Sequence, residues 1–146
     1  MPPRNNKTWN KTPNVEYISS ECYNNQKIFE AEQREIFSKV WVPMCHISEM
    51  YNKFQFRTTQ IAGQNVIAWN TGDRVKTYLN NGPQQPSGKV WNDDTFGKEL
   101  HCEVKHGGMV WVTLDPNPTM SVEEWTCGAF DCIADAIDTE EMEVFH

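Results

Sequence analysis

The chain has 146 residues, of which 38% are hydrophobic, with six Trp and seven Phe, enough for one domain with a sizeable core. Thirteen basic and twenty acidic side chains give a formal net charge of −7, which excludes a basic surface for nucleic acid or anionic lipid. An odd number of cysteines, five, without an apolar leader argues against a disulfide framework, and no apolar run approaches the roughly 20 residues of a membrane helix. We therefore expect a soluble, cytoplasmic protein with reduced thiols.

The first residues, 1–16, are predicted to form a flexible arm. Positions 1–14 hold three Pro, four Asn and three basic residues, which cannot bury enough surface to fold alone. The alternative is an arm that lies on a neighbouring subunit, with Trp9 as its anchor.

A helix is predicted over residues 26–38. Ser19 or Ser20 can cap a helix, and four apolar residues follow at helical spacing: Ile28, Phe29, Ile36 and Phe37. Residues 40–42 form a short β-prone run, and we expect Pro43 to end it.

Strands are expected to dominate the middle of the chain. Residues 54–61 alternate apolar and polar side chains, as in a half-buried strand. Residues 64–69 and 74–80 flank Asn70-Thr71-Gly72-Asp73, whose Gly and Asp are expected to supply the positive φ that a tight hairpin turn requires. Residues 81–100 show no clear periodicity, which is long for a structureless loop in a compact domain.

The last third of the chain combines strands with short helices. Residues 103–116 resemble a strand pair, and 109–114 within it are predicted to be a central strand that Pro116 and Pro118 end. Ser121 and Glu124 have capping-box spacing, and 130–137 continue in short helical pieces. The acidic residues gathered there, Asp131 among them, are interpreted as a solvated helix face.

Several short segments occur in an order that resembles the Rieske domain of the α subunits of Rieske non-haem iron oxygenases. These enzymes include ring-hydroxylating dioxygenases and related monooxygenases. The resemblance begins near Tyr17 and covers 28–37, 40–46, 56–69, 75–80, 103–116 and 142–146. It implies a mainly β fold over 17–146: a Rieske-like antiparallel core with one amino-terminal helix and short carboxyl-terminal helices. It also implies an electron-transfer [2Fe–2S] domain of an oxidoreductase, followed by a domain with mononuclear non-haem iron, which we expect to be absent here.

The ligands that the resemblance calls for are not in the sequence. The family holds its cluster with Cys-x-His and Cys-x-x-His, two cysteines on one iron and two histidines on the other. No cysteine of this chain is followed by His at either spacing, and Gly82 and Gln84 stand where the first pair belongs. We therefore predict no cofactor and no catalytic, cofactor-binding or metal residues, and a mobile 81–100 segment because no cluster ties it down.

Another metal site has little support from the remaining candidates. His101, Cys102 and His106 are close in sequence, but consecutive strand residues point to opposite faces, which argues against shared ligation. Cys45 is predicted to be a buried apolar side chain and His46 to bond a backbone carbonyl. No acid–base pair, nucleophile elbow or phosphate-binding loop is present.

Two classes of function remain. The resemblance implies a degenerate or partial Rieske-type oxygenase α subunit, not catalytic by itself, which is either inactive or a companion in oxygenase assembly. Its partners would be α or β subunits, in a trimer or α/β hexamer. The alternative is a non-redox protein-binding module that uses Trp91, Phe96 and Trp125. The substrate is not indicated by the sequence.

Overall fold

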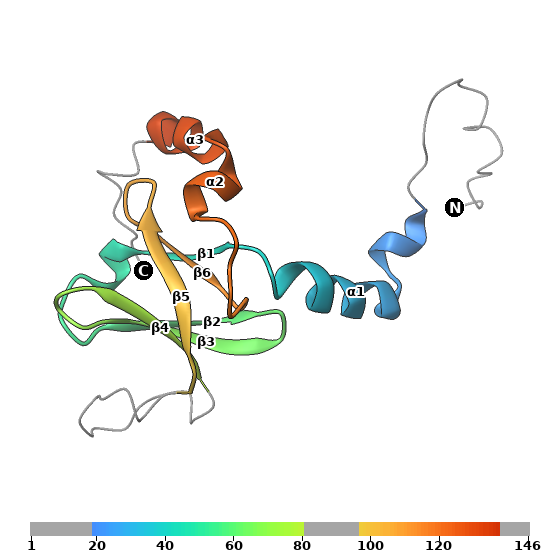
Figure 1. Ribbon diagram of the computed structural model, residues 1–146, viewed down its shortest axis with the longest axis horizontal. Coiled ribbons are helices and arrows are strands. Elements are labelled where there is room, and N and C mark those ends of the chain that lie inside the picture. Colours follow the sequence, from blue (N-terminus) through green and yellow to red (C-terminus); the bar gives the residue numbers. More distant parts are fainter. Residues whose placement is uncertain (1–18, 81–96, 138–146) are drawn as a thin grey trace, which may run out of the picture.

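The computed structural model of the chain describes residues 19–80 and 97–137, which form a six-stranded antiparallel sheet (Figure 1). The strand order is β1-β6-β5-β4-β3-β2, and the edge strands β1 and β2 approach each other, so that the sheet is nearly closed into a barrel. The prediction of a mainly β, antiparallel core is confirmed. The strands are β1 (Val42–His46), β2 (Phe56–Ile61), β3 (Gln64–Asn70), β4 (Val75–Leu79), β5 (Glu99–Lys105) and β6 (Met109–Thr113).

Short helices precede and follow the strands, and one, η4, lies between β1 and β2. They are η2 (Ser20–Tyr23), α1 (Gln26–Glu32), the π-helical turn η3 (Gln33–Phe37), η4 (Ile47–Met50), α2 (Val122–Thr126) and α3 (Ala129–Ile137). The helix predicted over 26–38 is present as α1 and η3, but Asn25 caps it, whereas Ser19 caps η2. None of the described helices is long and apolar enough to span a membrane.

The core follows from the alternation of side chains along β6 and β3. Val110 and Val112 of β6 belong to the two clusters that fill the inside of the sheet. Trp111, between them, points the other way and packs against Trp41 and Val122 of α2. Period-two alternation therefore lets one strand serve two cores. The prediction of a central strand here is confirmed, since β6 lies between β1 and β5.

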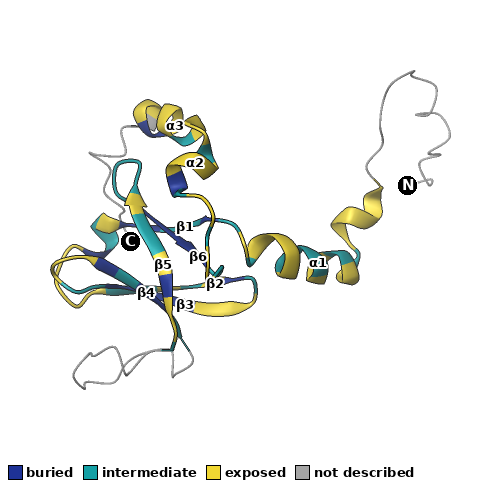
Figure 2. Ribbon diagram, in the orientation of Figure 1, coloured by how far each residue is buried: buried dark blue, intermediate teal, exposed yellow. Residues whose placement is uncertain are grey.

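The helix formed by α1 and η3 extends away from the sheet (Figure 1), and none of its residues is buried (Figure 2). Phe29 is 53% exposed and Ile36 is 48% exposed. Helices this short are marginal in water when nothing covers their apolar side. The apolar spacing predicted the helix correctly, but this apolar side lies open to solvent.

The prediction that Pro43 ends a strand is wrong. Pro43 lies inside β1, opposite Trp111, and the register shifts between Pro43 and Cys45. Because β1 is an edge strand in the sheet order, a residue without an N–H is tolerated at such an irregularity.

Two local predictions are confirmed. The β3–β4 hairpin is present with Gly72 at φ +98°, and the Thr71 N–H donates to the Arg74 carbonyl at 2.9 Å, although Asp73 does not share the positive φ predicted for it. Ser121 and Glu124 form the capping box at the start of α2. The predictions for 1–16, for Gly82 and Gln84, for Trp91 and Phe96, and for 81–96 of the predicted mobile segment lie outside the described residues. The structureless segment predicted over 81–100 extends too far, because Glu99 and Leu100 already belong to β5 and pair with Tyr78 and Thr77 of β4.

The β5–β6 turn, residues 106–108, requires glycine at its end. Gly108 has φ +109°, and a Cβ there would lie 2.7 Å from Nε2 of His46. The His46 Nε2–H donates to the Gly107 carbonyl at 2.8 Å, so the ring of His46 fixes this turn against the start of η4.

Candidate functional site

The ends of β4 and β5 meet at the place where the family resemblance puts its cluster ligands. Tyr78 pairs with Glu99 and Thr77 with Leu100. Beyond these pairs, the Leu79 N–H donates to the Lys98 carbonyl and the Gly97 N–H donates to the Leu79 carbonyl, both at 2.9 Å. We call this pairing of 77–79 with 97–100 the β4–β5 seam. Strand β4 ends at Leu79, and the chain re-enters the sheet next to Leu79, at Gly97 and Lys98.

The segment that joins the two sides of the seam contains no ligand for a metal cluster. Between Leu79 and Glu99 the sequence has neither Cys nor His. Gly82 and Gln84, which stand in for the first ligand pair, lie outside the described residues.

Cys45 and His46 are parts of the core. Cys45 is 7% exposed, and burial raises the pKa of its thiol to about 12, so that the thiolate needed for ligation is disfavoured. His46 uses both ring nitrogens inside the protein, because Nδ1 also accepts from the Ser48 N–H at 3.3 Å. These contacts fit the tautomer with its proton on Nε2. Both predictions, a buried small side chain and a histidine bonded to a carbonyl, are confirmed.

His101 and Cys102 make separate contacts from consecutive positions of β5. The exposed His101 places Nε2 3.2 Å from the Pro116 carbonyl oxygen. Cys102 donates from Sγ to the Val75 carbonyl at 3.4 Å, and burial raises the pKa of its thiol. Among residues 19–80 and 97–137 there is no group of three or more His, Cys, Asp and Glu side chains placed to hold a metal ion.

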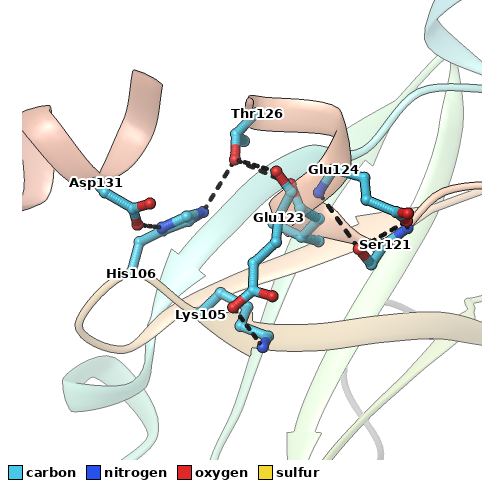
Figure 3. A network of polar contacts seen from close by, with 8 residues as sticks. Lys105, His106, Ser121, Glu123, Glu124, Thr126 and Asp131 are labelled. Carbon is cyan, nitrogen blue, oxygen red and sulfur yellow. Dashed lines mark hydrogen bonds and ion pairs between the residues drawn. The ribbon is translucent and has the colours of Figure 1, made fainter. Parts of the chain in front are cut away.

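His106 belongs to a network of polar contacts between the end of the β5–β6 hairpin and the carboxyl-terminal helices (Figure 3). Its imidazole is 2% exposed, and Nδ1 lies 2.7 Å from Oδ1 of Asp131 on α3. The ring also packs against Trp111 and Phe130, with centroid distances of 5.6 and 5.1 Å. Next to it, Lys105 Nζ donates to Glu123 Oε1 at 3.0 Å, which raises the pKa of Lys105. The β5–β6 turn is thereby tied to both carboxyl-terminal helices.

The His106 network has the composition of a catalytic triad but not its function. Thr126 Oγ1 lies 3.5 Å from His106 Nε2, while the same hydroxyl donates to the Val122 carbonyl at 3.0 Å. Because its proton is directed to a backbone oxygen, Thr126 is not activated by the histidine. We interpret the network as structural. The interpretation of Asp131 as part of a solvated face was therefore incomplete, and the separation of 25 residues from His106 gave no sequence signal.

No protein-family model matches the chain. Among curated proteins, the methanesulfonate monooxygenase hydroxylase subunit alpha of Methylosulfonomonas methylovora is 34% identical over 198 positions, covering 100% of this chain and 48% of that protein. The large subunit of anthranilate 1,2-dioxygenase of Acinetobacter baylyi is 38% identical over 168 positions, covering 87% and 36%. The chain thus spans about half the length, or less, of the curated relatives it matches.

Among solved structures, a quaternary ammonium Rieske monooxygenase aligns with a TM-score of 0.65 at 19% identity, covering 80% of this chain and 44% of that one. The described fold is therefore that of the Rieske oxygenases. The sequence match over the whole chain shows that the chain is homologous to about half of a Rieske oxygenase α subunit, and the fold agrees with this homology.

The five thiols are predicted to fall into two reactivity classes. Cys22, Cys127 and Cys132 are exposed, whereas Cys45 and Cys102 are shielded and their pKa values are raised by burial. A disulfide reagent at mildly alkaline pH should titrate three thiols quickly in the native protein and all five in denaturant. Rapid loss of Cys45, identified by peptide mapping, would contradict the described core.

Replacing His106 should loosen the attachment of α2 and α3. We expect His106→Ala to lower the free energy of unfolding by about 1–3 kcal/mol, because it removes a buried ring together with its partner for Asp131. The exposed His101→Ala is the matched control and should cost less than about 1 kcal/mol. Urea unfolding followed by tryptophan fluorescence measures both, and equal losses would contradict a specific role for the network.

Proposed function

We propose that this chain is a Rieske-type domain of an oxygenase α subunit that holds no [2Fe–2S] cluster, and that it acts as a companion in oxygenase assembly. The observation that carries the proposal is the β4–β5 connection, which lacks every Cys and His between Leu79 and Glu99. A cluster of this type needs two thiolates and two imidazoles from neighbouring loops.

The remaining donors do not fit such a cluster. Cys45 lies in the core with its pKa raised to about 12, and His46 is bonded through both nitrogens. The Cys102 thiol is directed to a backbone carbonyl, and His106 is held by Asp131. Bringing these side chains onto one pair of irons would require breaking the contacts that they make in the folded chain. No step of electron transfer is therefore assigned to the described residues.

A companion role is consistent with what the chain retains. The two curated relatives are named as subunits, so their names place them in assemblies. The chain keeps the folded scaffold and leaves large apolar side chains on α1 and η3 open to solvent. Exposed apolar surface of this kind is typical of contacts with another protein. On this proposal the chain binds an oxygenase subunit and supports assembly, but it carries out no electron transfer.

The cluster-free state is tested by measuring iron and acid-labile sulfide on protein purified without oxygen, with a visible spectrum alongside. We expect a colourless protein with both near zero per chain. A brown protein with stoichiometric iron and sulfide would refute the proposal, and the substitutions Cys45→Ser and Cys102→Ser would then identify the thiolate ligands.

The companion role is tested by affinity purification of the tagged chain after co-expression with the methanesulfonate monooxygenase α subunit. We expect the two chains to elute together. The competing function is a binding module that uses exposed aromatics, of which Trp125, 45% exposed, is described here. Trp125→Ala separates the two: a companion keeps its oxygenase partner, whereas a binding module loses its partner. Failure of the α subunit to co-elute would contradict the companion role.

A further inference from the structure

We infer that the chain lacks one internal block that its relatives carry between β4 and β5, and that the remaining scaffold is complete enough to accept that block again. This inference rests on the proposed absence of a cluster from the native chain. It goes further by placing the loss at one point of the fold and by assigning what the scaffold still does.

The loss is internal and long. The match with the methanesulfonate monooxygenase subunit covers the whole chain, yet it runs over 198 positions against 146 residues, which leaves at least 52 positions filled only by the relative. The match with the dioxygenase subunit also runs over more positions, 168, than this chain has residues. Since the first match includes the complete chain, the missing positions lie within it.

Most other connections in the sheet leave no natural place for such a loss, because each is closed by specific contacts. Ala62 and Gly63 alone join β2 to β3. The β3–β4 turn is closed by the bond from Thr71 to Arg74, and the β5–β6 turn is held by His46.

The two longer connections are also attached to the body of the protein. The segment between β1 and β2 is held where the Asn70 amide donates to the Met50 carbonyl at 2.7 Å. The segment between β6 and α2 is held where the Trp41 indole N–H donates to the Met120 carbonyl at 2.8 Å.

The β4–β5 seam differs from these connections in its geometry. Its two backbone bonds at Leu79, one to Lys98 and one to Gly97, bring the two strand ends together at the end of the ladder. A segment of any length can begin and end there without a change in the sheet, because the entry and exit points are neighbours. The pairing of Thr77 with Leu100 and of Tyr78 with Glu99 is already made in its absence. The scaffold therefore presents the two strand ends in the positions that a restored block needs.

The experiment places the block of the methanesulfonate monooxygenase subunit that has no counterpart in this chain between Asn80 and Gly97. The chimera is then reconstituted anaerobically with ferrous iron and sulfide. We expect about two irons and two sulfides per chain, with visible absorption that the parent chain lacks. One control carries Ser in place of every Cys of the block. A second control carries the intact block at Gly72 in the β3–β4 turn, and neither control should take up the cluster.

Three outcomes would overturn the inference. The seam chimera could fold with a single thermal transition yet bind no iron and sulfide, or it could fail to fold, and in either case the scaffold does not accept the block. Equal cluster content in the Gly72 chimera would show that the block needs no particular scaffold. Iron and sulfide in the parent chain would refute the proposed function, whereas an empty parent with an empty chimera refutes only this inference.

Discussion

The β4–β5 seam is the constraint on which the rest of the structure depends. It joins the β4-β3-β2 meander to the β5-β6 hairpin through two paired positions and two further backbone bonds. Thr77, which is fully buried, adds a bond from its hydroxyl to the Leu100 carbonyl at 3.3 Å. Because β1 pairs with β6, the seam also fixes where β1 lies relative to β2 and how nearly the sheet closes.

Local signals in the sequence predicted most of the fold. The Asn70–Asp73 turn and the Ser121–Glu124 capping box were predicted correctly because each depends on side chains a few residues apart. Pro43 was misjudged because its acceptability depends on whether its strand lies at an edge, which is a property of the sheet. The contact between His106 and Asp131 was missed for a related reason, since it joins a turn to a helix that only the tertiary fold brings together.

In the described part of the candidate site, cysteine and histidine residues stabilise the fold and are not placed to act as metal ligands. Cysteine and histidine suggest metal binding when only the sequence is considered, but here the neighbours of the buried ones show structural roles. His46 holds a turn, His106 attaches two helices, and Cys45 fills the core. The sequence did allow the ligand spacing to be tested, because the family pattern is strict. It could not show that the histidines already have other partners, which follows only from the folded contacts.

The closeness of the two strand ends at Leu79 also bears on the entropy of the chain. Each doubling of a flexible loop adds about 0.6 kcal/mol to the cost of bringing its ends together. Residues 80–98 join β4 to β5 here, whereas the inferred connection in the relatives is longer by at least 52 positions, nearly two doublings. The shorter connection therefore lowers the cost of forming the seam by about 1 kcal/mol. A chain with the shorter connection loses less conformational entropy when β4 and β5 pair. This smaller entropy cost partly offsets the loss of any stabilisation that a bound cluster would provide.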